Sequence, residues 1–479
     1  MSAIAFNQAP QIIGAVAYVV LIPRTLGADL YGQFAFVFAV FAVFHMLGEL
    51  GYQEVFSRFL PEVRHRSGEA GIRAMVRALF GVKLLVGLGL GLAAGLAARL
   101  LGGWITPWQA ALIGLSVTAR VWTMAAFPLL LGLGETLKWT VEGSWRQVAL
   151  TLLLLAIVQA PSLTQVLIAM AVDEIFFLLL GWWWVRGWLG SGKPEVMSQS
   201  SEPPVSDLRP PTSALLRFGF TFSLANFALA LMFRAAPIVV EKLTASHLEV
   251  GFFDLAQGGL LLLYILLGQV AYSFMPLLTQ LRLEGRPAEV DLWLGRFVRY
   301  AGILVALAAG GMWAVAGPIA PFLFGAGFAP AANTIRAVAV GLLPLPVAWA
   351  SVILSAVEKR PTHMVRAALA GLAIFLTGAT ALRVYASTGI AFAFGLALAG
   401  YAVGFGKNAA RAVRAGGGRW GITVGAAGIF LIFLFLPLPS LWLALGFWAA
   451  AAAVYTLAIL GLRVIAFDEI RQIVRALRR

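Results

Sequence analysis

The stretch from Leu189 to Pro211, LGSGKPEVMSQSSEPPVSDLRPP, interrupts an otherwise apolar chain. It holds five Pro and five Ser and has almost nothing apolar to bury, so we expect a flexible linker. Six long apolar runs precede it and eight follow it. The linker therefore divides the chain into two lobes, followed by two further runs.

The apolar runs set the fold class. The chain has 479 residues, 61% hydrophobic and only 12% charged. Each run has roughly the 20 residues that a helix needs to cross about 30 Å of hydrocarbon. We expect an all-α integral membrane protein with about fourteen transmembrane helices, arranged as two pseudo-symmetric six-helix lobes and two C-terminal helices. The expected spans are 3–22, 32–56, 78–98, 109–132, 140–160, 164–186, 213–240, 250–278, 293–316, 332–356, 362–385, 389–408, 420–437 and 440–462.

The domain division follows from these spans. We expect an N-terminal lobe at 1–188, a linker at 189–211, a C-terminal lobe at 212–414, and two extra helices with a basic tail at 415–479. The tail from 462 has the pattern of a basic amphipathic helix on the inner membrane surface.

Basic residues indicate the orientation. Of the 35 Lys and Arg, 26 lie in or beside alternate gaps, and only Arg24, Arg99, Lys242 and Arg383 lie in the opposite gaps. By the positive-inside rule, we expect the basic gaps and both termini to be cytoplasmic. The expected location is the cytoplasmic (inner) membrane. The gaps expected inside are 57–77, 133–139, 187–212, 279–292, 357–361 and 409–419.

The net charge of +14 lies beside spans, where anionic lipid head groups attract it, so membrane lipids are the expected partners and nucleic acid is excluded. The chain has no Cys, which excludes disulfides, thiolate zinc sites and Cys nucleophiles.

Internal matches indicate a repeat. Each lobe has an even number of spans and begins and ends on one side, so the two copies have parallel orientation. A shift of 219 places Asn7 on Asn226 and Gly32 on Gly251. We expect a duplicated bundle with a substrate path between the lobes.

Charged residues inside the spans are the functional candidates, because each costs about 2.5 to 3.5 kcal/mol at bilayer depth. Lys83 and Arg146 lie near the cytoplasmic ends of their spans, so we expect them to snorkel to the interface. Arg120 is about twelve residues from either end of its span, which predicts a place in a polar cavity. Arg234 and Arg336 lie nearer the outer ends of their spans, where a place in a cavity and snorkelling to the interface both remain open.

Four acidic residues are the candidates for ion coupling: Glu49, Asp173, Glu174 and Asp254. Asp173 and Glu174 are adjacent near the middle of a span, and two such carboxylates cannot both ionise without a cation or an Arg nearby. Two alternatives remain open, a buried ion pair with Arg120 or Arg146, and coupling to protons or sodium.

Polar stripes accompany these charges. Asp254, Gln257, Tyr264, Gly268 and Tyr272 share one face of a helix. Similar stripes run along the first span from Asn7 to Tyr18 and along the second from His45 to Tyr52. Hydrogen bonds between helices explain one such stripe, whereas three together favour a hydrated cavity.

The sequence contains no catalytic constellation. The four His are scattered with no pair at metal-ligand spacing, and Gly187 to Pro194 lacks the Ser or Thr of a P-loop. We therefore expect a protein that is not an enzyme and has neither a cofactor nor a metal. The energy for its activity would then come from an ion gradient or from the gradient of its substrate.

Short motifs carry a family resemblance. Ile22-Pro-Arg24 to Tyr31-Gly32 before an apolar span, and Leu50-Gly51 to Arg58-Phe-Leu-Pro-Glu62, resemble the opening of Wzx-type polysaccharide flippases of the multidrug/oligosaccharidyl-lipid/polysaccharide exporter superfamily. Further similar segments are Leu323-Phe-Gly325 with Phe328-Ala-Pro330, Glu358-Lys-Arg360, and Tyr385 to Ala391.

The resemblance implies a V-shaped pair of lobes that moves a polyprenyl-pyrophosphate-linked glycan to the outer leaflet, for surface polysaccharides such as the O-antigen of lipopolysaccharide. It also implies partners in polysaccharide polymerases and glycosyltransferases, and a monomer. Arg24 matches a family position, while Arg120, Arg234 and Arg336 are assigned to the pyrophosphate and sugar cavity by depth, with Asn7, Asn226 and Tyr264 beside them. The alternatives are a cation-coupled drug exporter of the same superfamily and a membrane glycosyltransferase, polymerase or ligase of surface glycans.

Overall fold

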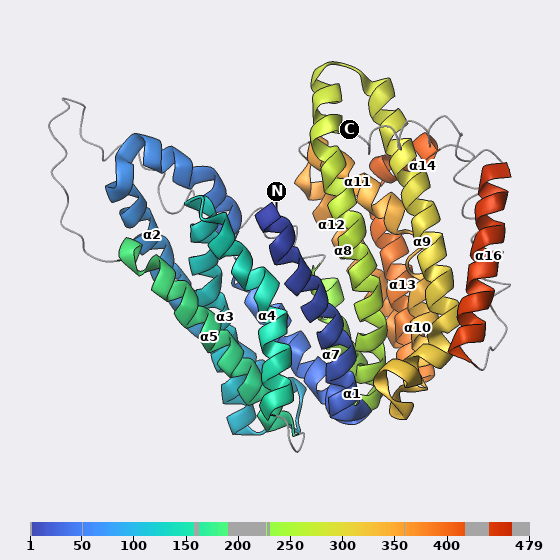
Figure 1. Cartoon of the computed structure of the whole chain (residues 1–479), viewed down its shortest axis with the longest axis horizontal. Helices are drawn as coiled ribbons and strands as arrows, with labels where there is room; N and C mark the ends of the chain where they lie inside the picture. Colours follow the sequence, from blue (N-terminus) through green and yellow to red (C-terminus); the bar gives the residue numbers. More distant parts are fainter. Residues whose placement is uncertain are drawn as a thin grey trace. The chain divides into compact units, whose positions relative to one another are not determined.

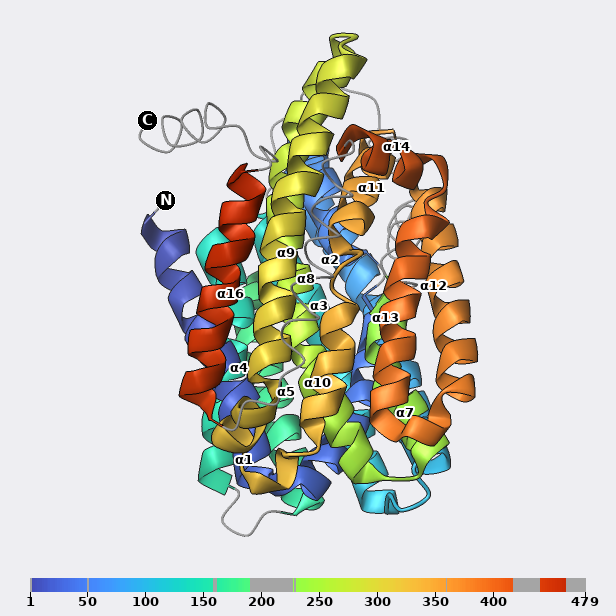
Figure 2. The same cartoon turned by 90° about the vertical axis from the view of Figure 1, so that its right-hand side faces the viewer.

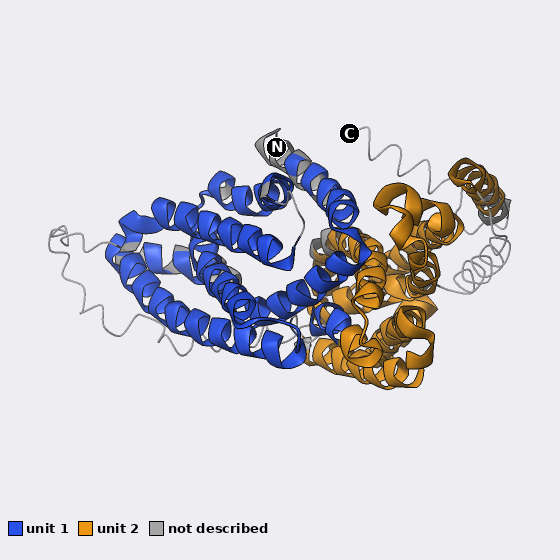
Figure 3. Ribbon diagram, turned by 90° about the horizontal axis from the view of Figure 1, so that it is seen from below, with its two compact units in different colours: residues 1–238 blue, residues 239–479 orange. Residues whose placement is uncertain are grey.

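The computed structural model describes residues 2–49, 51–157, 162–189, 227, 230–358, 360–416 and 440–461. All regular secondary structure in these ranges is helical (Figure 1, and turned by 90° in Figure 2). The chain forms two compact units, residues 1–238 and 239–479 (Figure 3). The expected all-α membrane fold is confirmed. The expected domain boundaries stay predictions, since most of the linker and the tail from 462 lie outside the described residues.

Eight described helices are long and apolar enough to cross a membrane, and a broken pair makes a ninth candidate. Helices α4 (Thr136–Ile157) and α16 (Leu441–Gly461) occupy two more of the expected spans. The expected span at 420–437 and most of the one at 213–240 lie outside the described residues.

Unit 1 contains α1 (Ser2–Leu47), α2 (Tyr52–Leu101), α3 (Pro107–Gly132), α4 and α5 (Leu163–Leu189). Both α1 and α2 are interrupted at a glycine, Gly27 with φ of 74° and Gly68 with φ of 57°. Only glycine adopts these dihedrals without strain, so each break is encoded locally. The gap expected at 57–77 is helical on both sides of Gly68, because its charged residues alternate with an apolar face that packs inward.

Small residues bring α2 and α3 together. Gly87, Gly91 and Gly95 recur every fourth residue on one face of α2, a pattern that lets helix backbones approach closely in membranes. A Cβ at Gly95 would lie 2.7 Å from the carbonyl oxygen of Ala110, and one at Gly114 would lie 2.7 Å from that of Gly91. The two backbones are therefore in direct contact along this seam.

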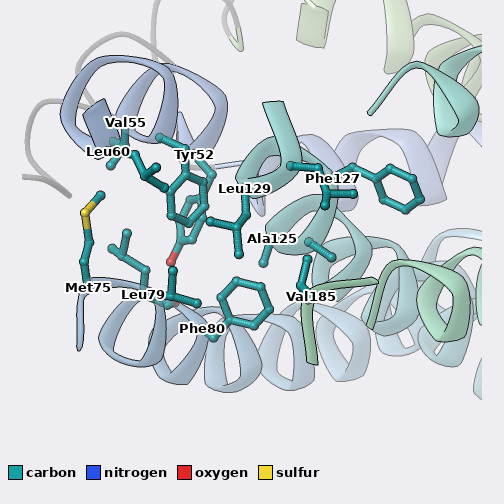
Figure 4. Close-up of a cluster of buried hydrophobic side chains, with 14 of the residues drawn as sticks. Tyr52, Val55, Leu60, Met75, Leu79, Phe80, Ala125, Phe127, Leu129 and Val185 are labelled. Carbon is teal, nitrogen blue, oxygen red and sulfur yellow. The ribbon is translucent and has the colours of Figure 1, made fainter. Parts of the chain in front are cut away.

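Beside the seam, apolar side chains from α2, α3 and α5 form a buried cluster. Figure 4 shows Tyr52, Leu79 and Phe80 of α2 facing Leu129 of α3 and Val185 of α5. The hydroxyl of Tyr52 donates a hydrogen bond of 2.7 Å to the carbonyl of Leu79, which satisfies its polar end inside the cluster. This cluster fixes the beginning of α2 against the body of the unit.

Unit 2 is built from helices that follow α7 (Ala236–Thr244), whose last residues belong to it. The long helices α8 (His247–Leu283) and α9 (Pro287–Phe324) pack against each other, and α16 packs against α9. The other helices are α10 (Ala331–Val340), α11 (Leu345–Val357), α12 (Pro361–Ala381), α13 (Ala386–Gly404) and α14 (Lys407–Gly416), with short 3-10 turns at Ala326–Phe328 and Arg383–Tyr385.

The expected span at 332–356 is broken. Helices α10 and α11 meet at an angle of 49°, with Gly341 and Pro344 in the connection. A Cβ at Gly341 would lie 2.6 Å from the Cα of Gly395 on α13, so the break rests directly on the neighbouring backbone. Sequence length alone did not reveal this bend, because the apolar run continues through it.

The glycine seam gives a direct test of the packing in unit 1. We expect Gly91→Leu to lower stability by about 2 kcal/mol, because the added side chain must push α3 away from α2. Gly89→Leu is the matched control, since a Cβ there meets nothing within 4 Å. Thermal unfolding in detergent measures both variants, and equal melting temperatures would contradict the assigned seam.

Candidate functional site

Unit 1 encloses a cavity of about 150 Å³. Its charged lining comes from Arg120 on α3, Glu142 on α4 and Glu49 in the turn before α2. Its remaining walls are mostly apolar and aromatic, and they consist of Tyr52, Met124, Phe127, Pro128 and Trp139. Arg120 faces this cavity, as expected from its depth in the span. Glu49 and Tyr52 of the expected stripe from His45 to Tyr52 also line it, but that stripe does not run along one helix, because α1 ends at Leu47 and α2 begins at Tyr52.

An alternating line of charges connects α3, α4 and α5. Arg120 Nη1 donates a hydrogen bond to Glu142 Oε1, and Arg146 Nε lies 3.2 Å from that same oxygen. Arg146 Nη1 in turn donates to Glu174 Oε1 at 2.6 Å. None of the four side chains is more than 19% exposed. We call these four residues, Arg120, Glu142, Arg146 and Glu174, the charge line.

The charge line follows from helix geometry. Glu142 and Arg146 are four residues apart on α4, so they lie on one face, one turn from each other. That face points between α3, which carries Arg120, and α5, which carries Glu174. Removing one member of a buried pair leaves an uncompensated charge at a cost of about 3 to 5 kcal/mol, so the four residues support one another.

The structure bears on the sequence-based interpretations of Arg146, Glu174 and Asp173. Arg146 was expected to snorkel, yet it pairs with Glu142 and Glu174 inside the unit, so that expectation is wrong. Glu174 forms the ion pair with Arg146, which was one of its two alternatives, while its role in ion coupling stays a prediction. Asp173 remains different, because its side chain is 1% exposed and its Oδ1 has no hydrogen-bond partner among the described residues.

Lys83 was also expected to snorkel, and the structure corrects this. Its side chain is 1% exposed, and Nζ donates to the carbonyl oxygens of Gly48 at 2.5 Å and of Glu49 at 3.0 Å. The ammonium also lies 4.0 Å from the ring centroid of Tyr52, a cation–π arrangement. Lys83 therefore closes the carbonyl end of α1 and holds the turn that carries Glu49.

Other basic candidates of unit 1 lie around the cavity or away from it. Arg234 lies with its guanidinium 6.0 Å from the Phe38 ring centroid. His45, whose Nδ1 is 3.1 Å from the carbonyl oxygen of Phe41, interacts electrostatically with Arg120, Arg146 and Arg234. Arg24 is exposed and lies close to the break at Gly27.

The remaining candidates lie in unit 2 or outside the described residues. Arg336 on α10 donates to Asn333 Oδ1 at 3.2 Å. Tyr264 on α8 packs its ring 4.8 Å from that of Trp349, whose Nε1 donates to the Tyr264 carbonyl. Asp254 is half-buried on α8. Asn226 and the side chain of Asn7 lie outside what the structure describes.

Glu142 is the site residue that sequence reasoning missed. The signal was available, because Glu142 and Arg146 have the spacing of a helical ion pair within an expected span.

Among the described residues of unit 2, ion pairs lie at or near helix ends. Arg411 on α14 pairs with Asp291 on α9 at 2.6 Å, and Arg282 lies 3.6 Å from Glu358. In the exposed turn between α8 and α9, hydrogen bonds from Arg286 and then from Gln280 lower the pKa of Glu284. In the part of the chain that the structure describes, no group of three or more His, Asp or Glu side chains is arranged to hold a metal ion.

The fold is that of a multi-pass helical membrane protein with a charged cavity inside unit 1. Residues 3–282 match the family model described as "Polysaccharide biosynthesis protein". The chain belongs to this family, which confirms the resemblance to polysaccharide flippases. No curated protein matches the chain.

Solved structures support the fold. The lipid II flippase MurJ in an inward closed conformation is 11% identical, with a TM-score of 0.67 over 96% of this chain and 99% of its own. An inward-facing MATE family multidrug resistance transporter of the MOP superfamily is 13% identical, with a TM-score of 0.64 over 85% of this chain and 95% of its own. The bent form of the Vibrio cholerae MATE transporter VcmN is 14% identical, with a TM-score of 0.53 over 89% of this chain and 96% of its own.

The position of Lys83 generates a prediction about stability. We expect Lys83→Met to lower the free energy of unfolding by about 2 kcal/mol, because two buried carbonyl groups lose their donor. Lys138→Met is the control, since Lys138 pairs with Glu135 at 3.3 Å while its side chain is 42% exposed. If both variants melt at the wild-type temperature, Lys83 does not hold the turn.

Proposed function

We propose that the protein is a flippase that moves a polyprenyl-pyrophosphate-linked oligosaccharide across the cytoplasmic membrane by alternating access. The observation that carries the proposal is Arg120, a cavity-lining cation inside a membrane-spanning unit of a polysaccharide biosynthesis protein. The fold shared with the lipid II flippase MurJ supports it. The product would supply a surface polysaccharide such as an O-antigen, with glycosyltransferases and a polymerase as functional partners of a monomeric flippase.

The chemistry of the head group favours this assignment. A pyrophosphate carries about two charges that hydrocarbon rejects, and guanidinium groups bind such oxygens with two parallel hydrogen bonds. Arg120 faces the cavity. Arg120 and Arg234 both interact electrostatically with His45, so the two arginines lie in the same charged region. We assign the first contact with the pyrophosphate to Arg120, with Arg24 and Arg234 as further cations along its path.

The other candidate residues keep their proposed roles. Arg336, Asn7, Asn226 and Tyr264 are assigned to the sugar and pyrophosphate path. Among the acidic residues, Glu174 is paired with Arg146, whereas Asp173 keeps an unpartnered carboxylate oxygen. Asp173 is therefore the first candidate for coupling to protons or sodium, ahead of Glu49 and Asp254.

A cation-coupled drug exporter is the second candidate function, and the similarity to MATE transporters favours it. The two functions differ in the charge of the substrate, because a drug cation would be repelled by Arg120 and attracted by Glu49 and Glu142. The family and the structural neighbours favour a transporter over a membrane enzyme of glycan assembly.

The proposed orientation places both termini in the cytoplasm. The chain has no Cys, so single cysteines report sidedness without background. Glu135→Cys, between α3 and α4, should be labelled by an impermeant maleimide only in inverted inner-membrane vesicles. Gly103→Cys, at the other end of α3, should be labelled only in intact spheroplasts. The reverse pattern would contradict the orientation.

The role of Arg120 is tested by transport. We expect Arg120→Ala to slow the flipping of a labelled polyprenyl-pyrophosphate sugar in liposomes by about tenfold to a hundredfold, since a charge-assisted contact contributes about 1.5 to 3 kcal/mol. Arg99→Ala, at the exposed end of α2, is the control and should flip at the wild-type rate. Unchanged flipping by Arg120→Ala would remove Arg120 from the substrate path.

A further inference from the structure

One carboxylate oxygen of the charge line is shared between two arginines. Glu142 Oε1 accepts the hydrogen bond from Arg120 Nη1 and lies 3.2 Å from Arg146 Nε. We propose that Glu142 is a built-in counter-ion that the phosphate of the substrate displaces from Arg120, and that Arg146 receives the displaced carboxylate. The nature of the displacing anion rests on the proposed function.

The two arginines differ in whether they line the cavity. Arg120 and Glu142 both line the cavity, whereas Arg146 and Glu174 are not among its lining residues. An anion in the cavity therefore reaches Arg120 and competes with Glu142 for it. Arg146 does not line the cavity, so it stays available to Glu142 when an anion occupies Arg120.

Arg146 has the donors needed to receive Glu142. Its Nε and Nη2 atoms are buried without a hydrogen-bond partner in the described part of the chain, although Nε is only 3.2 Å from Glu142 Oε1. Buried unsatisfied donors are costly, so a small rotation that brings Glu142 onto them is favourable once Arg120 has another partner. The displaced carboxylate therefore does not become an unpaired buried charge.

The exchange has a consequence for transport. A flippase must release the substrate it binds, and a bare Arg in a low-dielectric cavity would hold pyrophosphate strongly. Competition from Glu142 lowers the affinity, and the return of Glu142 to Arg120 favours release. Glu142 thus sets the affinity for the anion without contacting the sugar or the lipid tail.

The experiment measures anion binding to purified full-length protein in detergent by isothermal titration calorimetry. The probes are inorganic pyrophosphate and a sugar-free polyprenyl pyrophosphate. We expect Glu142→Gln to bind both about tenfold more tightly than the wild type, because the competing charge is lost. In liposomes the same variant should flip the lipid about tenfold more slowly, because release is delayed.

A double-mutant cycle assigns the effect to the competition. In an Arg120→Gln background, adding Glu142→Gln should change the dissociation constant by less than twofold, since the arginine that lines the cavity, for which Glu142 and the anion compete, is gone. Glu69→Gln is the matched control, because Glu69 forms an exposed ion pair with Arg73 outside the cavity. Its binding constants should equal those of the wild type.

The inference is overturned if Glu142→Gln binds pyrophosphate as the wild type does or more weakly, or if its gain persists without Arg120. Should Glu142→Gln fail to fold, Glu142→Asp decides the question, because the shorter side chain draws the carboxylate back toward its own helix α4, which also carries Arg146, and away from Arg120 on α3. It should also tighten binding, and unchanged binding would refute the exchange.

The proposed function fails separately. If Glu142→Gln tightens pyrophosphate binding while the wild type flips no polyprenyl-pyrophosphate sugar, the counter-ion exchange stands and the substrate assignment falls. If the wild type flips the lipid and Glu142→Gln leaves binding unchanged, only the exchange is refuted.

Discussion

An ionised side chain inside a membrane span is tolerated only beside an opposite charge or strong hydrogen-bonding groups, and unit 1 satisfies this condition across three helices. Arg120 on α3, Glu142 and Arg146 on α4, and Glu174 on α5 alternate in sign. Each helix carries a charge that would be costly without its neighbour. The relative positions of α3, α4 and α5 are therefore restricted by electrostatics as well as by packing, and the cavity lies where the line ends at Arg120.

The walls of that cavity depend on backbone contacts. The glycine seam joins α2 to α3, and Lys83 on α2 holds the carbonyls of the turn that carries Glu49. The two units differ in this respect, because unit 2 packs α8 on α11 through Tyr264 and Trp349, and the ion pairs described in it lie near helix ends. Glu49, Arg120 and Glu142 of unit 1 line a cavity, while Arg411, Asp291 and Glu358 of unit 2 connect helix ends.

The sequence predicted the helices whose apolar length equals one span. The spans expected at 109–132 and 164–186 correspond to α3 and α5 within three residues at each end. The break between α10 and α11 was not predicted, because it depends on the contact of Gly341 with Gly395 far along the chain. The depth of Arg120 in its span predicted that it faces a cavity. The same criterion wrongly assigned Lys83 and Arg146 to the membrane interface, because the distance to the interface does not show whether a neighbouring helix offers a nearer partner.

The positive and negative charges of the charge line cancel, which explains how the cavity can be stable both with and without a bound anion. Two arginines and two glutamates cancel, so the fold of unit 1 does not require a bound phosphate to neutralise Arg120. A cavity of unpaired arginines would need its substrate for stability and would resist releasing it. Because Glu142 is shared, an arriving anion changes which arginine Glu142 pairs with rather than leaving a buried charge unpaired. The same carboxylate that stabilises the unit thus limits how tightly Arg120 can hold an anionic ligand.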